Sequence, residues 1–263
     1  MSRPPEPSPT RPAADAPQPT AGANPLLDAF HAATALGTDT ADARAAAIGT
    51  YGFAIPSDEA LDAIERYSPD GVVELGAGTG YWASLLHRRG VDVVAFDLEP
   101  PPSPQNAWFA GSRPWHPVHR GDHDRVREHA GRTLLLVWPT KNEIWAAAAL
   151  DAYREAGGQC VVFVGEGPGG RTGDATFHAL LGAVSSCLQC EYGAMAEPCI
   201  CGVEPRWRRT ATIALPQWPG FADALHVYLP AEAGDGDRPR RSGRWRIRRP
   251  AWGQTGAARL TRT

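Results

Sequence analysis

The feature that most constrains this chain is a regular alternation of short apolar runs with stretches of helical periodicity. The runs at 72–75, 91–97 and 133–138 are rich in Val, Leu and Phe, which is typical of strands buried on both faces of a parallel sheet. Helical stretches at 81–89 and 143–155 follow the first and the third run. The alternation therefore predicts a doubly wound α/β fold.

The chain is also expected to form one large sheet. Four further runs have strand character and bring the expected count to seven: 117–120, 159–165, 210–215 and 224–229. A link containing Pro and Gly at 216–221 joins the last two runs as a hairpin. With 263 residues, 43% of them hydrophobic, the chain can bury one full core. We therefore expect a mostly parallel seven-stranded sheet in a main domain at 71–230.

The N-terminal part of the chain is expected to lie outside this sheet. Seven of the first twenty residues are Pro, so residues 1–24 have too little apolar surface to offset their ordering entropy and are predicted to be disordered. Apolar periodicity then predicts helices at 25–36, 41–51 and 57–67. We expect 25–70 to be a helical region, with a lid and a dimer contact as its two open roles.

The composition disfavours a membrane or secreted protein. The sequence contains no run of about 18 apolar residues, and no apolar stretch follows the early Arg residues, so neither a membrane span nor a secretory signal is expected. Four of the five cysteines crowd into 187–201, unlike the spread of a disulfide framework. We expect a cytoplasmic location.

A glycine-rich turn follows the first predicted strand and has an acid on each side. Residues 72–80 are Val-Val-Glu-Leu-Gly-Ala-Gly-Thr-Gly, and Asp97 ends the second predicted strand. Such a turn lets a ligand approach the backbone, and the second acid can accept hydrogen bonds from ribose hydroxyls. The dinucleotide fingerprint is G-x-G-x-x-G, whereas the glycines here follow G-x-G-x-G after Glu74. The spacing and the leading acid therefore disfavour a dinucleotide.

These residues resemble the first motif of the class I, Rossmann-like S-adenosylmethionine-dependent methyltransferase family, and the resemblance covers residues 51–229. It implies that Glu74 orients the loop or meets the amino group of the cofactor through water, and that Asp97 binds the ribose. It also implies that a stretch of backbone passes beside the methionine part: Gly76, Ala77, Gly78 and Gly80.

Two further cofactor contacts follow from the same resemblance. Asp122 resembles the adenine-contacting acid of the family, with Asp124 as the alternative, and Tyr51 begins a segment that could fold over the cofactor. Family members that methylate exocyclic amines of bases often carry N/D-P-P-Y/F after the fourth strand. Residues 137–141 are instead Val-Trp-Pro-Thr-Lys, which disfavours a nucleobase N-methyltransferase.

The acceptor substrate is expected at the loops that leave the carboxyl ends of the strands. These loops contain aromatic and charged residues, namely Trp82, Trp138, Lys141, Glu143, Glu166 and Trp218. Aromatic side chains with carboxylates favour a small apolar or aromatic molecule. Glu166 is the preferred general base, with a loop-anchoring role as its alternative, and a base is optional because the sulfonium is already activated.

A cysteine array interrupts the domain at 185–206 and has the pattern C-x2-C-x8-C-x-C. Four thiolates so close together can enclose Zn²⁺ in a tetrahedral shell, which leaves no open position and therefore indicates structural zinc. Chance clustering and a redox pair are the alternatives. The predicted zinc ligands are Cys187, Cys190, Cys199 and Cys201.

The C-terminal segment 231–263 is predicted to be a flexible Arg-rich tail. Residues 238–263 hold nine Arg and no acid, although the net charge of the chain is −3, so the rest of the chain is acidic. An acidic body is a poor match to a protein whose main face grips nucleic acid. Contact with RNA, an acidic partner or a leader peptide is expected only through the tail.

The sequence thus favours O- or N-methylation of a small molecule or modified peptide with S-adenosylmethionine. An RNA- or protein-modifying methyltransferase recruited by the zinc loop and the tail is one alternative. Transfer of another part of the cofactor is a second, and a non-catalytic S-adenosylmethionine-binding module is a third. A homodimer is left open.

Overall fold

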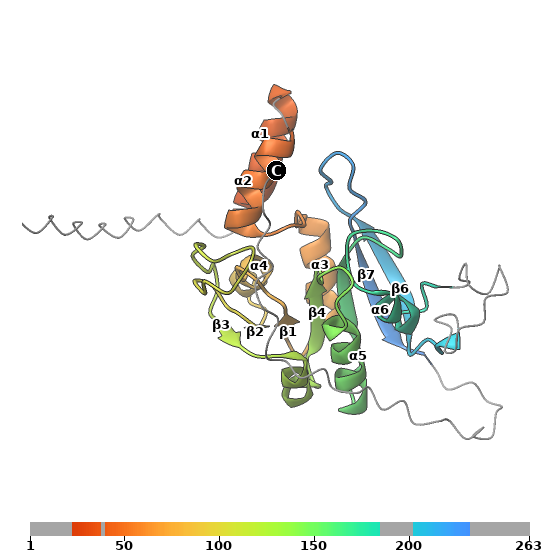
Figure 1. The fold of residues 1–263 in the computed structure, drawn as a ribbon. Helices are drawn as coiled ribbons and strands as arrows, with labels where there is room; N and C mark the ends of the chain where they lie inside the picture. The colour runs from red at the N-terminus through yellow and green to blue at the C-terminus, as the bar shows by residue number, and fades with distance from the viewer. Residues whose placement is uncertain (1–22, 38–39, 185–201, 232–263) are drawn as a thin grey trace, which may run out of the picture. The chain divides into compact units, whose positions relative to one another are not determined.

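The strands of the chain form one seven-stranded sheet in the order β3-β2-β1-β4-β5-β7-β6 (Figure 1). The computed structural model describes residues 23–37, 40–184 and 202–231. The strands are β1 Val72–Leu75, β2 Val93–Asp97, β3 Val118–Arg120, β4 Thr133–Val137, β5 Val161–Gly165, β6 Trp207–Ala214 and β7 Ala224–Pro230. Most of the predicted segments 1–24 and 185–206, and the tail beyond 231, lie outside the described residues.

Helices precede and connect the strands. They are α1 Pro25–Leu36, α2 Thr40–Tyr51, α3 Asp58–Tyr67, α4 Tyr81–Arg88, the 3-10 helix η1 His123–His129, α5 Trp145–Glu155 and α6 Ala175–Leu180. Strands β1 to β5 pair in parallel, and β7 runs antiparallel to both β5 and β6. The predicted mostly parallel seven-stranded α/β sheet is therefore confirmed. Among the described residues no helix is long and apolar enough to cross a membrane.

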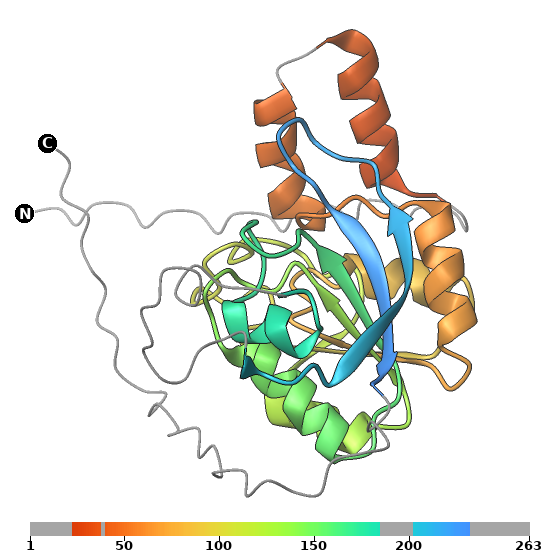
Figure 2. The same cartoon turned by 90° about the vertical axis from the view of Figure 1, so that its right-hand side faces the viewer.

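Alternation along the strands separates the core into two clusters, one on each face of the sheet. In β4, Leu135 belongs to the cluster beneath α3 and α4, whereas Leu134 and Leu136 belong to the cluster beneath α5 and α6. The views in Figures 1 and 2 show these helices as layers on the two sides of the sheet. Because both faces are covered, the strands are apolar on nearly every residue. This is the physical origin of the pattern in the sequence.

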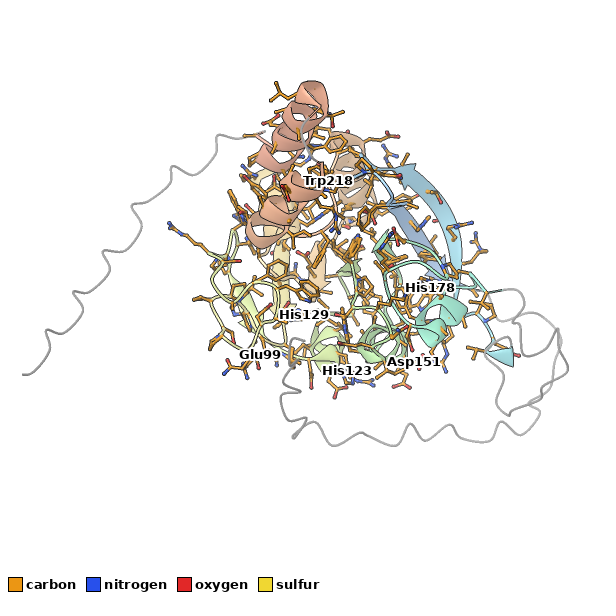
Figure 3. All side chains as sticks on the ribbon, turned by 45° about the horizontal axis from the view of Figure 1, so that its top comes forward. Glu99, His123, His129, Asp151, His178 and Trp218 are labelled. Carbon is orange, nitrogen blue, oxygen red and sulfur yellow. The ribbon has the colours of Figure 1, made fainter. Side chains whose placement is uncertain are left out.

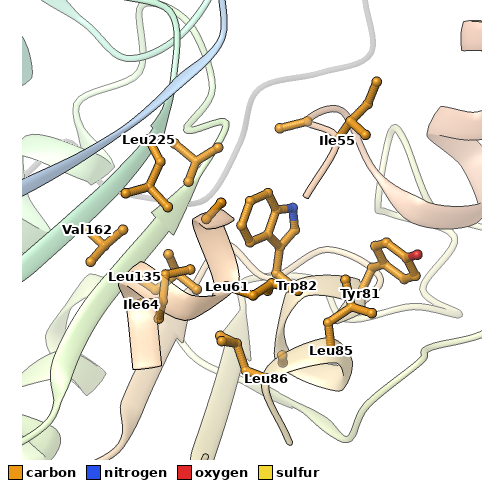
Figure 4. Packing of buried hydrophobic residues seen from close by; sticks show 14 of the residues in the cluster. Ile55, Leu61, Ile64, Tyr81, Trp82, Leu85, Leu86, Leu135, Val162 and Leu225 are labelled. Carbon is orange, nitrogen blue, oxygen red and sulfur yellow. The ribbon is translucent and has the colours of Figure 1, made fainter. Parts of the chain in front are cut away.

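Helix α4 contributes much of the first cluster. Trp82 is only 4% exposed and lies among Leu61, Leu85 and Leu135 in the close view of Figure 4. Burial of a tryptophan side chain there contributes roughly 2–3 kcal/mol to folding. The structure therefore gives Trp82 a packing role and removes it from the candidate acceptor contacts.

The N-terminal helices form a hairpin, and the residue that caps its first helix is tied to the segment before α3. Helices α1 and α2 lie side by side, apart from the layers that cover the sheet (Figures 1 and 2). Asn24 caps α1 by accepting a hydrogen bond from the Leu27 N–H at 3.2 Å. Its amide donates to the Pro56 carbonyl at 2.9 Å. The hairpin is thus anchored by a buried polar residue at its base.

Candidate functional site

The loop between β1 and α4 has a backbone conformation that requires glycine. Gly76, Gly78 and Gly80 have φ values of +72°, +54° and +70°, in the left-handed region. A Cβ built on Gly78 would lie 2.6 Å from Cε2 of Phe109, and one on Gly76 would lie 2.7 Å from Cη2 of Trp145. Ala77 lies between them and its N–H donates to the Phe96 carbonyl at 3.0 Å. Both the turn and the close approach of neighbouring rings therefore exclude larger residues.

Asp97 lies at the carboxyl end of β2 and faces this loop. Its Oδ2 accepts a hydrogen bond from the Gly78 N–H at 2.9 Å, and its Oδ1 accepts one from the Glu99 N–H at 2.9 Å. Each carboxylate oxygen has a second lone pair. Asp97 therefore holds the glycine loop and keeps acceptor capacity for another donor.

Glu74 is the most deeply buried acid of the loop region, with 1% exposure. It shares the face of Val72. Burial raises the pKa of Glu74 to about 8, with a smaller contribution from the charge of Asp97, whereas the Ala83 backbone N–H in the first turn of α4 acts in the opposite direction. Its Oε2 is buried without a hydrogen-bond partner.

Tyr51 touches the loop through its backbone. Its carbonyl accepts a hydrogen bond from the Thr79 hydroxyl at 2.8 Å, and its ring stacks on Trp115 at 5.3 Å between ring centroids. The Trp115 indole N–H donates to the Thr50 carbonyl at 2.7 Å. The C-terminus of α2, the glycine loop and the β2–β3 connection are therefore joined at one place.

Asp122 lies beside the end of β2, because the Gly121 N–H donates to the Asp97 carbonyl at 2.9 Å. Its side chain is exposed and caps η1, accepting a hydrogen bond from the Asp124 N–H at 3.1 Å. Of the two acids considered from the sequence, Asp122 is the one adjacent to Asp97. The structure thus brings Glu74, Asp97 and Asp122 to one edge of the sheet.

A second group of side chains lies at the carboxyl ends of β4 and β5. Glu166 is 3% exposed and both of its carboxylate oxygens accept hydrogen bonds. Oε1 accepts from the Arg171 guanidinium at 2.9 Å and from the Ala222 N–H at 3.1 Å, and Oε2 accepts from the Arg171 N–H at 2.7 Å. This arrangement favours the anchoring role over the role of general base.

Trp138 follows β4 in a strained backbone conformation, with φ of +52°. Its N–H donates to the Val164 carbonyl at 2.8 Å, and its indole N–H donates to Oδ1 of Asp223 at 2.7 Å. A bulky residue with positive φ persists only where its surroundings hold it, and such residues are common at functional sites. The ring of Phe53 stacks on the indole at 4.8 Å with an interplanar angle of 5°.

Asp223 precedes β7 and is 2% exposed. The pKa of Asp223 is raised to about 6, mainly by burial and also by the charge of Glu166, whereas Trp138, Arg44 and Arg171 act in the opposite direction. The Arg44 guanidinium, from α2, lies 3.9 Å from the centroid of the Phe221 ring. Residues from both ends of the chain therefore meet above β4 and β5.

Trp218 is another predicted crevice residue, and the structure buries it against α1. It is 3% exposed and makes an edge-to-face contact with Phe30 of α1 at 5.2 Å, as its position next to the hairpin in Figure 3 indicates. Its role is to seat α1 on the β6–β7 link.

The predicted zinc ligands lie outside the described residues. Within 23–37, 40–184 and 202–231, no group of His, Cys, Asp and Glu is suited to hold a metal ion. Cys160, the described cysteine, is buried and free. The zinc site therefore remains a prediction.

Sequence reasoning missed Arg44, Asp223 and Phe109, whereas Phe53 lies in the segment after Tyr51 that is expected to fold over the cofactor. The signal for Asp223 was present, since it directly precedes the last strand-like run at 224–229. An antiparallel last strand begins at the edge where the parallel strands end, which places Asp223 beside Trp138. Arg44 lies on a helix whose packing the sequence did not predict.

The comparisons with known proteins concern solved structures, because no family model and no curated protein matches the sequence. A magnesium protoporphyrin IX methyltransferase from Synechocystis PCC 6803 with bound SAH has 10% identity and a TM-score of 0.35, over 66% of this chain and 83% of that chain. An rRNA methylase from Streptococcus thermophilus has 10% identity and a TM-score of 0.35, over 66% and 95%. A protein of the NADB-Rossmann superfamily from Streptococcus agalactiae has 10% identity and a TM-score of 0.39, over 67% and 69%.

Since these similarities are low, the assignment of the fold rests on the chain itself. The sheet order is β3-β2-β1-β4-β5-β7-β6 with β7 alone reversed, and the acid and glycine turn lies between β1 and α4. Asp97 ends β2 and contacts that turn. The chain therefore has a Rossmann-like, doubly wound α/β fold.

Proposed function

We propose that this protein is an S-adenosylmethionine-dependent methyltransferase that acts on a small molecule or modified peptide. The observation that carries the proposal is the position of two acids, Glu74 and Asp97, on either side of the glycine loop. Glu74 has a buried oxygen without a hydrogen-bond donor, and Asp97 binds the Gly78 N–H. Both acids stand where the family motif has them.

The residues present fit this cofactor. The orphaned Oε2 of Glu74 is an acceptor that the amino group of the methionine part could satisfy directly or through water. Asp97 keeps lone pairs for ribose hydroxyls. Gly76, Gly78 and Gly80 adopt the positive-φ turn between β1 and α4 in which the family motif has its glycines. Asp122 follows Gly121, whose N–H donates to the Asp97 carbonyl, and in this proposal its carboxylate contacts adenine; Tyr51 borders the loop.

The cofactor, when bound, supplies an activated methyl group on a sulfonium. The chain's own contribution is to position the acceptor and exclude water. Trp138 and Phe53 offer flat apolar surface at the carboxyl ends of the strands. Glu166 accepts hydrogen bonds from Arg171 and Ala222, and so connects the β5–α6 loop to the residues before β7. Structural zinc in the cysteine array remains a subsidiary hypothesis. RNA recruitment by the zinc loop and the Arg-rich tail is another, and it predicts that deletion of residues 238–263 abolishes substrate binding.

The test is isothermal titration of the full chain with S-adenosylmethionine and with S-adenosylhomocysteine. We expect both to bind wild type, and Asp97→Ala to lower the affinity at least tenfold, because it removes a charged acceptor from ribose. Asp70→Ala, at an exposed turn, is the matched control and should bind normally. A folded wild-type protein that binds neither compound would refute the proposal.

A further inference from the structure

Two side chains of opposite charge converge on the Trp138 indole, and each has unused hydrogen-bonding capacity. Asp223 Oδ1 accepts from the indole N–H at 2.7 Å, and the Arg44 Cζ lies 5.6 Å from the centroid of the indole ring. Nevertheless, within the described residues the two do not form an ion pair at 4.0 Å or less. The Asp223 carboxylate and the Arg44 guanidinium thus lie near the same indole ring without a direct ion pair between them.

Asp223 presents one free carboxylate oxygen. Its side chain is almost completely buried, and among the described residues none donates a hydrogen bond to Oδ2. The charged groups that influence it are Glu166 at the end of β5, Arg171 in the following loop and Arg44 on α2. Burial keeps the pKa of Asp223 near 6, so this carboxylate is ionised at neutral pH and well suited to take a proton.

Arg44 is held by rings and not by carboxylates. Its Cζ lies 3.9 Å from the centroid of Phe221, where a cation–π contact stabilises the guanidinium. Its Nε is buried and has no hydrogen-bond partner. A buried donor without a partner is costly, so the arrangement is explained by a ligand that supplies an acceptor.

One chemical group satisfies both side chains at once, namely a hydroxyl. Its hydrogen can be donated to Asp223 Oδ2 while its oxygen accepts from Arg44. A neutral amine fits less well, because methylation leaves a positive charge on nitrogen next to the guanidinium of Arg44. An oxygen acceptor instead gains negative character as its proton leaves, which Arg44 stabilises.

We propose that Asp223 and Arg44 bind and activate the hydroxyl of an aromatic acceptor, with Asp223 as the proton acceptor and Arg44 as the group that stabilises the developing oxyanion. The inference rests on the proposed function and specifies its acceptor atom. The O–H bond breaks and its proton goes to Asp223 Oδ2 while the oxygen forms a bond to the methyl carbon. The carbon–sulfur bond breaks, its electron pair stays on sulfur as the neutral thioether, and Asp223 later releases the proton to water.

The aromatic nature of the acceptor follows from the rings beside these two residues. Phe53 and Trp138 are stacked nearly parallel, and Phe53 also contacts Trp108, whose side chain is 59% exposed. A planar ring can stack on this surface with its hydroxyl toward Asp223. Aromatic stacking contributes on the order of 1 kcal/mol beyond the burial of apolar area.

The experiment uses a matched pair of probes, 4-methylphenol and 4-methylaniline, which are both uncharged at neutral pH, are both nucleophilic and differ in the acceptor atom. Binding to the full chain is measured by titration in the presence of S-adenosylhomocysteine, and methylated products are measured by mass spectrometry with S-adenosylmethionine. We expect 4-methylphenol to bind and to be methylated on oxygen, and 4-methylaniline to remain unmethylated. Methylation of the aniline, or no binding of the phenol, would overturn the inference.

Variants assign the effect to the two residues. Asp223→Asn and Arg44→Gln should each weaken 4-methylphenol binding at least tenfold, and Asp223→Asn should remove the loss of turnover expected as the pH falls below about 6. Asp70→Asn and Arg208→Gln, at exposed positions, are the matched controls. Normal phenol binding by both folded variants would contradict the inference.

Cofactor titration separates this inference from the proposed function. Both variants should bind S-adenosylmethionine as wild type does, since neither residue contacts the glycine loop. If wild type binds no cofactor, the proposed function fails. If wild type binds the cofactor but neither binds nor methylates the phenol, only the assignment of the acceptor is wrong. If Asp223→Asn does not fold, Arg44→Gln alone decides.

Discussion

The Tyr81 hydroxyl donates a hydrogen bond of 2.8 Å to Oδ1 of Asn24, although the two residues are 57 positions apart. The same hydroxyl accepts from the Leu26 N–H at 3.1 Å. Tyr81 begins α4, directly after the glycine loop, and Asn24 precedes α1. The base of the N-terminal hairpin is therefore fastened to the first residue of the helix that carries the candidate cofactor loop.

This link predicts coupled losses of stability. Tyr81→Phe and Asn24→Ala should each lower the free energy of unfolding by about 1–2 kcal/mol, because buried polar groups lose their partners. The double variant should lose less than the sum by about 0.5 kcal/mol or more. Denaturant unfolding checks this, with Thr34→Ala, whose hydroxyl bond on α1 is exposed, as the control. Strictly additive losses would show that the pair is not coupled.

The glycine loop predicts a difference between two glycines that share positive φ. Gly78 has Phe109 within 2.6 Å of a built Cβ, whereas Gly90, with φ of +89°, has nothing within 4 Å. Gly90→Ala should therefore cost about 1–2 kcal/mol, from the backbone alone. Gly78→Ala should cost about 1–3 kcal/mol more, from overpacking.

Thermal unfolding of both variants measures this difference. In a Phe109→Ala background the added cost of Gly78→Ala should shrink toward that of Gly90→Ala, since the crowding ring is gone. Equal losses at the two glycines in the wild-type background would show that Phe109 moves aside freely.

Glu74 predicts a dependence of stability on pH. Its pKa is raised from 4.5 to about 8 in the folded chain, so between these values the folded state binds the proton that the unfolded state has released. The free energy of unfolding therefore falls as the pH rises through this window, by up to about 1.4 kcal/mol per pH unit. Glu74→Gln cannot ionise and should lose this part of the slope.

Urea denaturation at a series of pH values checks the prediction. Glu59→Gln, at an exposed position on α3, serves as the control for loss of one surface charge. An unchanged slope in Glu74→Gln would mean that Glu74 is not the group responsible.

The hydrogen bonds of the Glu166 carboxylate predict that replacing it with an uncharged amide lowers the free energy of unfolding. Glu166→Gln removes the charge that holds Arg171 and places an amide where backbone N–H groups now donate. We expect the free energy of unfolding to fall by about 1.5–3 kcal/mol, as for other buried hydrogen bonds to charged groups. Asp174→Asn, which keeps a capping oxygen on α6, is a milder control. Wild-type stability in Glu166→Gln would argue against the anchoring role.

The amino-acid sequence by itself determined the layered α/β fold. Val72, Leu135 and Val162 lie in one cluster and their neighbours in the other, so burial on both faces imposes apolar runs that can be read without a structure. The glycine loop could also be recognised from the sequence, because its conformation allows few residues besides glycine. Glu74 and Asp97 were found because they stand at fixed distances from that loop.

Only the tertiary structure decided which polar groups have partners. Glu166 and Asp223 are both acids at the same edge, yet the first has both oxygens occupied and the second has one free. Arg44 comes to this edge from α2 through packing between segments distant in sequence. Hydrogen-bond satisfaction depends on such long-range contacts, which local periodicity does not encode, and this is why the candidate acceptor site appeared only in the folded chain.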